Sequence, residues 1–297
     1  MNTIPKTTEF KREATGWGTF PFTDEDFRRI AGILHESAGI HLPASKSSLV
    51  YSRLTRRLRA LGLESFRDYC AFIVSERGIA ERQTMIAALT TNVTSFFREP
   101  HHFTHLKKHV LERRLDEVRK GGRLRLWSAA CSSGQEPYSI AMTILSLLPE
   151  ALSLDVRVLA TDIDFNMIAN AKAGVYDRDA MQSVPSDLRD AYFRRSGEGA
   201  DASWTVSEKL SSLVAFRELN LIGDWPMKGQ FDAVLCRNVV IYFDEATQHK
   251  IWSRFLPFLK REGRLYIGHS ERVSGPACES LIADGVTTYR LKGKDAR

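Results

Sequence analysis

The sequence predicts an α/β protein whose larger part is a mainly parallel sheet with helices on both faces. From Leu124 onward, strand-like runs alternate with helix-like patterns, which is typical of parallel sheets. Residues 20–90 show only helical periodicity with short connections, so we expect a small all-helical domain there. The stretch 174–212 is too long for a plain crossover and contains many turn residues. It predicts a small antiparallel β insertion with an exposed tip.

The helical domain is expected to contain four helices. Thr23 followed by three acidic residues gives a cap and an acidic first turn, and Gly39 marks the end of that helix. The others are expected at about 47–60, 65–75 and 80–89. Residues 1–20 have no apolar stretch and are interpreted as a disordered terminus, not a signal peptide. The predicted domains are therefore 21–89, a junction at 90–101, and 102–297.

The predicted second domain opens with a long helix over 102–120. Its strands are expected at 124–128, 156–161, 213–218, 231–236 and 263–268. Two further strands are expected at about 278–283 and 286–291. Asp284-Gly285 between them is a hairpin signal, so we expect the sheet to end in an antiparallel pair.

Composition excludes several classes of protein. The chain of 297 residues is 43% hydrophobic, which is ordinary for a soluble globular protein. No apolar run reaches the roughly 18–20 residues that a membrane-spanning helix needs, so we expect no membrane insertion. None of the four cysteines forms a C-x-x-C pair, so no metal site is predicted. Unpaired thiols suit a reducing cytoplasm.

The net charge of +6 is unevenly distributed. Residues 1–120 carry 20 Lys and Arg against 14 Asp and Glu, whereas residues 121–297 carry 22 of each. No acidic residue lies between Glu36 and Glu64. We expect this segment to attract an acidic partner. Its basic residues are Lys46, Arg53, Arg56, Arg57 and Arg59.

Two strand ends indicate a nucleoside cofactor. The first strand runs into a turn of small residues around Gly134, and the second ends on Asp162. Such a turn lets the backbone approach a ligand, and the acid can bind ribose hydroxyls. Gly134 is the only glycine in the turn, so the G-x-G-x-x-G of dinucleotide sites is missing. Glu136 would repel a pyrophosphate but suits a cationic ligand without phosphate, and S-adenosyl-L-methionine is such a ligand.

Five segments, in order along the chain, together resemble the bacterial chemotaxis receptor glutamate methyltransferases. This resemblance implies a Rossmann-like S-adenosylmethionine-dependent methyltransferase sheet. It also implies transfer of the methyl group to glutamate side chains of chemoreceptors. The matching segments are TTNVTSFFRE (90–99), SAACSSGQEPYSIA (128–141), ATDID (160–164), FDAVLCRNVVIYF (231–243) and GHSE (268–271).

The resemblance also assigns site residues. It places Arg98 and Tyr242 at the methyl-transfer centre. The residues implied at the cofactor are Asn92, Thr94, Arg98, Glu136, Asp162, Asn220, Leu221, Arg237 and Asn238. The expected partners are the cytoplasmic domains of chemoreceptors, whose acidic helices would dock on the helical domain through Arg53, Arg56, Arg57 and Arg59. In some members the β insertion also tethers a receptor's C-terminal peptide, and the sequence leaves this open here.

The expected chemistry needs no general base. A glutamate side chain has a reference pKa of about 4.3, so it is already a carboxylate at neutral pH. The protein has to align the carboxylate oxygen, the methyl group and the sulfur, and alignment of this kind can contribute about 7–11 kcal/mol. We expect Arg98 to orient one carboxylate oxygen, with Tyr242 helping to fix the geometry.

Two other functions compete with this interpretation. The pI of about 9.2 and the basic helix are compatible with a nucleic-acid methyltransferase. However, the chain lacks Asn-Pro-Pro-Tyr, Asp-Pro-Pro-Tyr and a Pro-Cys nucleophile, so we expect no nucleic-acid partner. The other alternative is a catalytically silent module that binds S-adenosylmethionine and docks on receptors. The intact Arg98, Asp162 and Tyr242 argue against it, although they do not prove turnover.

Overall fold

The computed structural model describes residues 19–293. These residues form two compact units, which are described separately. The first comprises residues 19–37 and 41–89, and the second comprises residues 38–40 and 90–293. The disordered terminus expected at 1–20 falls mostly on residues 1–18, which lie outside the described residues. No helix within residues 19–293 is long and apolar enough to cross a bilayer.

The first unit is entirely helical, as the sequence predicts. Thr23 and Asp26 form a reciprocal cap at its start, because the Asp26 N–H donates to Thr23 Oγ1 at 3.2 Å and the Thr23 N–H donates to Asp26 Oδ2 at 3.0 Å. The elements are α1 (Asp24–Ala38), η1 (Ala44–Lys46), α2 (Ser47–Leu61), α3 (Phe66–Val74), η2 (Glu76–Gly78) and α4 (Ile79–Leu89).

A buried carboxylate links three helices of this unit. Glu81 on α4 is only 6% exposed, and it receives both Arg57 Nε (2.9 Å) and Arg57 Nη2 (2.6 Å) from α2. The hydroxyl of Tyr69 on α3 donates to the same carboxylate at 2.9 Å. Burial, together with the adjacent Glu81 charge, raises the pKa of Tyr69 well above its ordinary value. The fork of two parallel bonds fixes α2 against α4.

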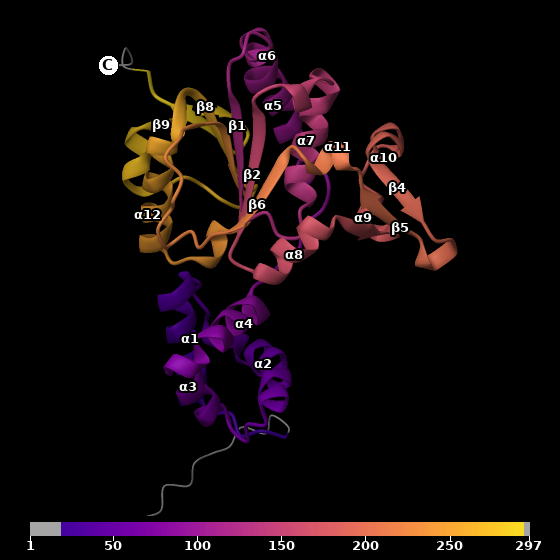
Figure 1. Cartoon of the computed structure of the whole chain (residues 1–297). Coiled ribbons are helices and arrows are strands. Elements are labelled where there is room, and N and C mark those ends of the chain that lie inside the picture. The colour runs from indigo at the N-terminus through magenta and orange to yellow at the C-terminus, as the bar shows by residue number, and fades with distance from the viewer. Residues whose placement is uncertain (1–18, 294–297) are drawn as a thin grey trace, which may run out of the picture. The chain divides into compact units, whose positions relative to one another are not determined.

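The second unit is built on a seven-stranded sheet with the order β6-β2-β1-β7-β8-β10-β9 (Figure 1). Neighbours from β6 to β8 pair in parallel, and β10 pairs antiparallel with both β8 and β9. The strands are β1 (Leu124–Ala129), β2 (Val156–Asp162), β6 (Val214–Glu218), β7 (Phe231–Cys236), β8 (Leu259–Ile267), β9 (Leu281–Gly285) and β10 (Thr288–Leu291). The chain moves outward from β1 to β6 and then returns to the other side of β1. The order therefore switches between β1 and β7, where open α/β sheets bind ligands.

Helices cover both faces of this sheet (Figure 1). The helices of the second unit are α5 (Pro100–Leu106), the π-helical η3 (Lys107–Leu111), α6 (Glu112–Arg119), α7 (Gln135–Leu147), α8 (Phe165–Ala173), α9 (Arg178–Met181), α10 (Ser186–Tyr192), α11 (Glu208–Ser211) and α12 (Glu245–Phe255). Of these, α9 and α10 lie beside the β insertion and not on the seven-stranded sheet. The short η helices are η4 (Ala151–Ser153), η5 (Gly199–Asp201), η6 (Val240–Tyr242), η7 (Leu256–Phe258) and η8 (Gly275–Glu279).

Alternate side chains of each strand enter different cores, as the two-residue period of a strand requires. On β1, Leu124 and Leu126 join the core formed with α5 to α7. Trp127 and Ala129 belong to the core formed with α12. Both cores are fully buried around β1, so the central strands are fixed from both sides.

The predicted β insertion is a three-stranded antiparallel sheet with the order β3-β5-β4. Its strands are β3 (Val175–Asp177), β4 (Phe193–Ser196) and β5 (Ser203–Val206). Phe96 packs edge-on against Tyr176 and Phe193, with ring centroids 4.9 and 5.6 Å away. These contacts attach the small sheet to the segment that precedes α5.

Two predicted details are wrong. The hairpin turns at Val286-Thr287 and not at Asp284-Gly285, because β9 continues to Gly285 while the Asp284 carboxylate binds Arg264 and Arg290 across the sheet. The single helix expected over 102–120 begins earlier, with Pro100 in its first turn. It is then interrupted by the π-helical turn.

Candidate active site

Loops at the carboxyl edge of the parallel strands contain most of the unusual backbone of the described chain. Six non-glycine residues between 19 and 293 have a positive φ. Five of them lie in three segments: the junction before α5, the turn after β1 and the loop after β7. They are Phe97, Glu99, Ala130, Ser132 and Asn238. Such conformations cost free energy and persist where the surroundings enforce them, which is common at functional sites.

Asp162 lies at the end of β2 and is 6% exposed. Its Oδ2 accepts from the Ser132 N–H at 2.7 Å, and its Oδ1 accepts from the Asp164 N–H at 2.9 Å. Burial raises the pKa of Asp162 to about 6, against the opposing effect of these backbone hydrogen bonds. Each oxygen retains a lone pair that can accept from a ribose hydroxyl.

The turn after β1 depends on Gly134. Its φ is +96°, and a Cβ there would lie 2.9 Å from both Ala171 Cβ and Tyr176 Oη. A side chain at this position would therefore be strained and would collide with α8 and β3. The glycine therefore lets the start of α7, which carries Glu136, pack closely against α8 and β3.

Several hydrogen bonds connect the segment 90–99 to this edge. Asn92 Nδ2 donates to Asp164 Oδ2 at 2.8 Å, and the Asn92 carbonyl accepts from Ser132 Oγ at 2.9 Å. The Phe97 N–H donates to Ser139 Oγ at 3.0 Å. Thr94 is half-buried in the same segment. Asn92 thus has a structural partner in addition to its predicted cofactor role.

Arg98 is half-buried, and its Nη1 donates to the carbonyl of Val93 at 2.9 Å. This bond closes the segment on itself. Among the described residues it is the only hydrogen bond of the Arg98 guanidinium, so the other N–H groups can serve a ligand.

Glu136 and Arg237 form a buried ion pair. Arg237 Nη1 donates to Glu136 Oε2 at 2.9 Å, and Ser128 Oγ donates to Glu136 Oε1 at 2.6 Å. Arg237 Nη2 donates to the carbonyl of Arg98, which joins the loop after β7 to the segment 90–99. Burial raises the pKa of Glu136, and the Arg237 charge opposes that rise. Both residues were predicted to touch the cofactor, and the structure gives each of them an internal partner.

Asn220 and Leu221 follow β6. Asn220 Oδ1 accepts from the Ile222 N–H at 3.1 Å, which shapes the turn. The Leu221 carbonyl accepts from Trp225 Nε1 at 3.2 Å and from Arg254 Nη1 at 2.7 Å. Hydrogen bonds to the Leu221 carbonyl therefore fix the turn that is predicted to border the adenine.

Tyr242 ends the short helix η6 in the loop after β7 and is half-buried. Its hydroxyl has no hydrogen-bond partner among residues 19–293. The loop begins with Asn238 in a left-handed conformation, with φ +59°. Asn238 packs against Gly268, where a Cβ would lie 2.5 Å from Asn238 Nδ2. Glu271 accepts backbone hydrogen bonds throughout this loop, from Asn238 onward.

Comparison with known proteins decides the family. Residues 25–90 match the family described as "CheR methyltransferase, all-alpha domain", and residues 92–283 match "CheR methyltransferase, SAM binding domain". The chain belongs to the CheR methyltransferase family. Its second unit therefore contains a domain that binds S-adenosylmethionine, as the strand ends indicated.

Curated relatives are similar over most of their length. A "Probable chemotaxis protein methyltransferase" of Rhizobium etli is 50% identical over 262 residues, which is 88% of this chain and 98% of the relative. A "Chemotaxis protein methyltransferase" of Klebsiella aerogenes is 43% identical over 91% of each chain. One from Escherichia coli is 42% identical over 85% of this chain and 86% of the relative.

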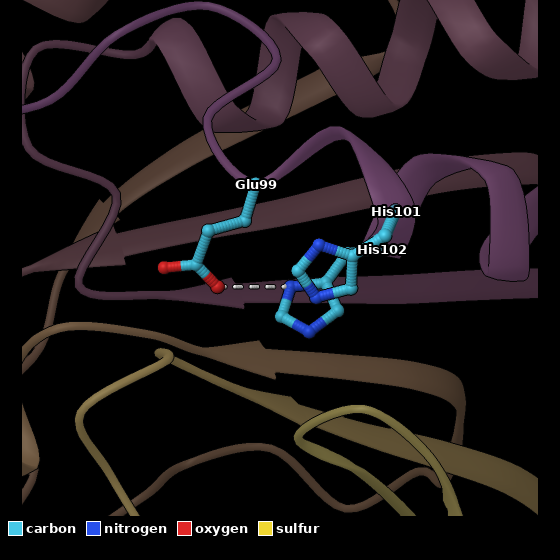
Figure 2. A group of neighbouring side chains, drawn as sticks. All are labelled: Glu99, His101 and His102. Carbon is cyan, nitrogen blue, oxygen red and sulfur yellow. Dashed lines mark ion pairs between the residues drawn. The ribbon is translucent and has the colours of Figure 1, made fainter.

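A group of three side chains beside Arg98 resembles a metal site (Figure 2). One ligand atom from each of Glu99, His101 and His102 lies within 4.8 Å of the others. Arg237 Nη2 is already 3.4 Å from Glu99 Oε2, and His269 Nδ1 is 3.0 Å from Glu99 Oε1. The positive charge of Arg237 compensates the negative charge of Glu99 and would repel a metal cation. We therefore assign no metal to this group of three side chains.

The four arginines predicted to dock a receptor differ in environment. Arg57 holds Glu81, and Arg53 Nη1 donates to the Ala88 carbonyl at 3.2 Å, so both have partners within the first unit. Arg56 and Arg59 are exposed. Arg53 and Arg57 thus have hydrogen-bond partners within the first unit, whereas the Arg59 guanidinium lies 6.0 Å from the centre of the Phe20 ring.

Sequence reasoning missed two elements of this CheR site. Glu271 lies in the matching segment GHSE but had no predicted role, and Arg237 was not expected to hold the Arg98 carbonyl. Both contacts join residues far apart in the chain, 33 positions for Glu271 to Asn238 and 139 for Arg237 to Arg98. An acid four residues after the end of the buried strand β8 was the available signal for Glu271.

Proposed function

We propose that this CheR methyltransferase transfers the methyl group of S-adenosylmethionine to glutamate carboxylates of chemoreceptors, with Arg98 and Tyr242 aligning the acceptor. The products are glutamate methyl esters and S-adenosylhomocysteine. The observation that carries the assignment of residues is the hydrogen bond from Arg237 to the Arg98 carbonyl. It joins the segment containing Arg98 to the loop containing Tyr242 at the switch point of the sheet.

The charges at the strand ends suit the proposed cofactor. Glu136, Asp162 and Asp164 are buried there, and the guanidinium of Arg237, buried beside them, is paired with Glu136. A pyrophosphate would meet uncompensated carboxylates, whereas a sulfonium or an ammonium would be attracted. Asp162 would hold the ribose, and the Asn220-Leu221 turn would border the adenine. When bound, S-adenosylmethionine supplies a methyl group activated by positively charged sulfur.

In this proposal the chain's residues orient groups and move no proton. The receptor carboxylate is ionised at neutral pH, so it attacks without a base. Arg98 keeps one N–H on the Val93 carbonyl and presents the others to one carboxylate oxygen. The second oxygen stays free to form the new bond to carbon. The Tyr242 hydroxyl, which has no partner within residues 19–293, would donate to the acceptor and complete the alignment.

We infer that the receptor docks through acidic helices on the exposed Arg56 and Arg59. A second contact is proposed at β4, which pairs only with β5 among the described strands and carries exposed Arg194 and Arg195. Its outer edge can accept an extended peptide as an added strand. A receptor's C-terminal tether is the proposed occupant. Because the substrate is the receptor's cytoplasmic domain, the reaction is placed in the cytoplasm.

A transfer assay tests this function. Protein, methyl-labelled S-adenosylmethionine and a receptor cytoplasmic fragment are combined, and the product is treated with mild alkali. Release of volatile labelled methanol would show a carboxyl methyl ester. Clear cofactor binding without label on any of several receptors would instead favour the catalytically silent module. A receptor fragment with its glutamates changed to glutamine is the control and should remain unlabelled.

A further inference from the structure

Glu271 makes an unusual set of contacts for a side chain outside the proposed centre. Its carboxylate is 8% exposed and accepts from five backbone N–H groups. Oε2 accepts from Gly268 at 2.6 Å and Asn238 at 2.9 Å. Oε1 accepts from Val239 at 2.9 Å, from Val240 at 2.8 Å and, more weakly, from Ile241 at 3.4 Å. Four of these donors are consecutive residues that lead directly to Tyr242.

The loop cannot satisfy these donors alone. The helix η6 is a single turn, in which the Tyr242 and Phe243 N–H groups bond back to Val239 and Val240. The preceding N–H groups therefore have no partner within the turn, and leaving them buried and unpaired would be costly. The two oxygens of the Glu271 carboxylate accept the hydrogen bonds of these N–H groups. The left-handed Asn238 is held by the same group.

We infer that Glu271 is a positioning residue for methyl transfer, which fixes the loop 238–242 so that Tyr242 faces the acceptor carboxylate. This inference rests on the proposed role of Tyr242. Glu271 itself touches neither acceptor nor cofactor in the proposal. Its chemical effect is to set the backbone from which the tyrosine projects, and displacement of a catalytic group by about 1 Å can lower turnover about a hundredfold.

Glu271→Gln is the decisive variant. The amide has one acceptor oxygen and one donor group, so it can serve the Gly268 and Asn238 pair or the Val239 and Val240 pair, but not both. We expect kcat to fall about tenfold or more while KM for the receptor fragment changes by less than about twofold, since only alignment is lost. Hydrogen exchange at Val239 and Val240 should become about tenfold faster, with Val234 in β7 unchanged.

A double-mutant cycle separates positioning from general stability. In a Tyr242→Ala background, Glu271→Gln should cost less than about twofold in kcat, because the group that it positions is gone. The same full loss in both backgrounds would overturn the inference, and so would unchanged kcat in Glu271→Gln. Glu262→Gln, an exposed change on β8, is the matched control and should behave as the unmodified protein. If Glu271→Gln does not fold, Glu271→Asp replaces it in the cycle.

Failure of the proposed function gives a different pattern. If Tyr242→Ala alone keeps full turnover, Tyr242 has no part in the chemistry. The proposed role of Tyr242 and the positioning role of Glu271 are then both wrong. If Tyr242→Ala is impaired while Glu271→Gln is not, only the positioning role of Glu271 is overturned.

Discussion

Asp162 shows how burial sets the behaviour of one carboxylate. Its pKa of about 6 lies above the reference value of about 3.9, because desolvation outweighs the backbone hydrogen bonds that the carboxylate accepts. The folded state therefore binds this proton more tightly than the unfolded chain. The corresponding stabilisation is present at low pH and is lost as the pH rises through about 6. Near neutral pH the ionised group disfavours folding but is ready to accept hydrogen bonds.

Cofactor affinity should consequently depend on pH. Below about pH 6 a proton on Asp162 removes an acceptor, and the raised pKa of Glu136 acts in the same direction. We expect the affinity for S-adenosylhomocysteine to fall about tenfold between pH 7 and pH 5, measured by calorimetry. Asp162→Asn should bind more weakly with a flatter pH profile. An affinity that is equal at both pH values would contradict the ribose role.

Arg98 provides a test of geometry at constant charge. Arg98→Lys keeps the positive charge but loses the planar fork and the bond to the Val93 carbonyl. We expect kcat to fall about 10–100-fold, because alignment of the acceptor carboxylate depends on the planar fork and on the bond to the Val93 carbonyl. Turnover with a receptor fragment measures this, and thermal unfolding checks the fold. Full activity in Arg98→Lys would show that a point charge suffices.

At the scale of elements, the turn after β1 is constrained by contacts and not only by conformation. Gly134→Ala would place a methyl group 2.9 Å from Ala171 Cβ at a φ of +96°. We expect it to lower the free energy of unfolding by about 2–4 kcal/mol. The matched control is Gly199→Ala, which has a φ of +58° and open space, and should cost only about 1 kcal/mol. Thermal unfolding measures both variants. Equal losses of unfolding free energy in Gly134→Ala and Gly199→Ala would mean that the neighbours of Gly134 shift to accommodate the methyl group.

The strands were predictable because apolar runs and their terminal acids are local in sequence. The predicted range 231–236 matches β7, and β2 ends on Asp162 as expected. What the sequence could not supply are pairings between distant elements. The hairpin moved because Asp284 binds Arg264 across strands. The partners of Arg57, Arg237 and Glu271 depend on packing, and no spacing rule assigns them.

At the scale of the whole molecule, the excess positive charge lies in residues 1–120, whereas the remainder is neutral. Two arginines of α2 are used internally, so only part of this charge is available to a partner. Receptor docking by Arg56 and Arg59 would be electrostatic and exposed. It should therefore weaken with salt, since the Debye length is only about 8 Å at physiological ionic strength.

Neighbouring arginines should therefore respond differently to the same substitution. Arg57→Ala leaves buried Glu81 without its ion pair, so we expect a loss of about 1–3 kcal/mol in the free energy of unfolding. Arg56→Ala should leave stability unchanged, and Arg56→Glu with Arg59→Glu should raise KM for the receptor severalfold. Denaturant unfolding and steady-state kinetics at two salt concentrations measure these effects. An unchanged KM in the double variant would place docking elsewhere.

Trp225 donates to the Leu221 carbonyl, stacks edge-on with Trp127 at 5.0 Å and lies under the Arg254 guanidinium at 4.2 Å. An indole in such a setting is a built-in optical reporter. Its emission depends on the polarity and charge around the ring, and ligand at the adjacent turn would alter both. Filling of the adenine end can thus be followed by intrinsic fluorescence without a label. The methyl-transfer end has no tryptophan in its loops at 90–99 and 237–242. Tryptophan emission would then report occupancy of the cofactor site, and release of labelled methanol would report turnover in the same sample.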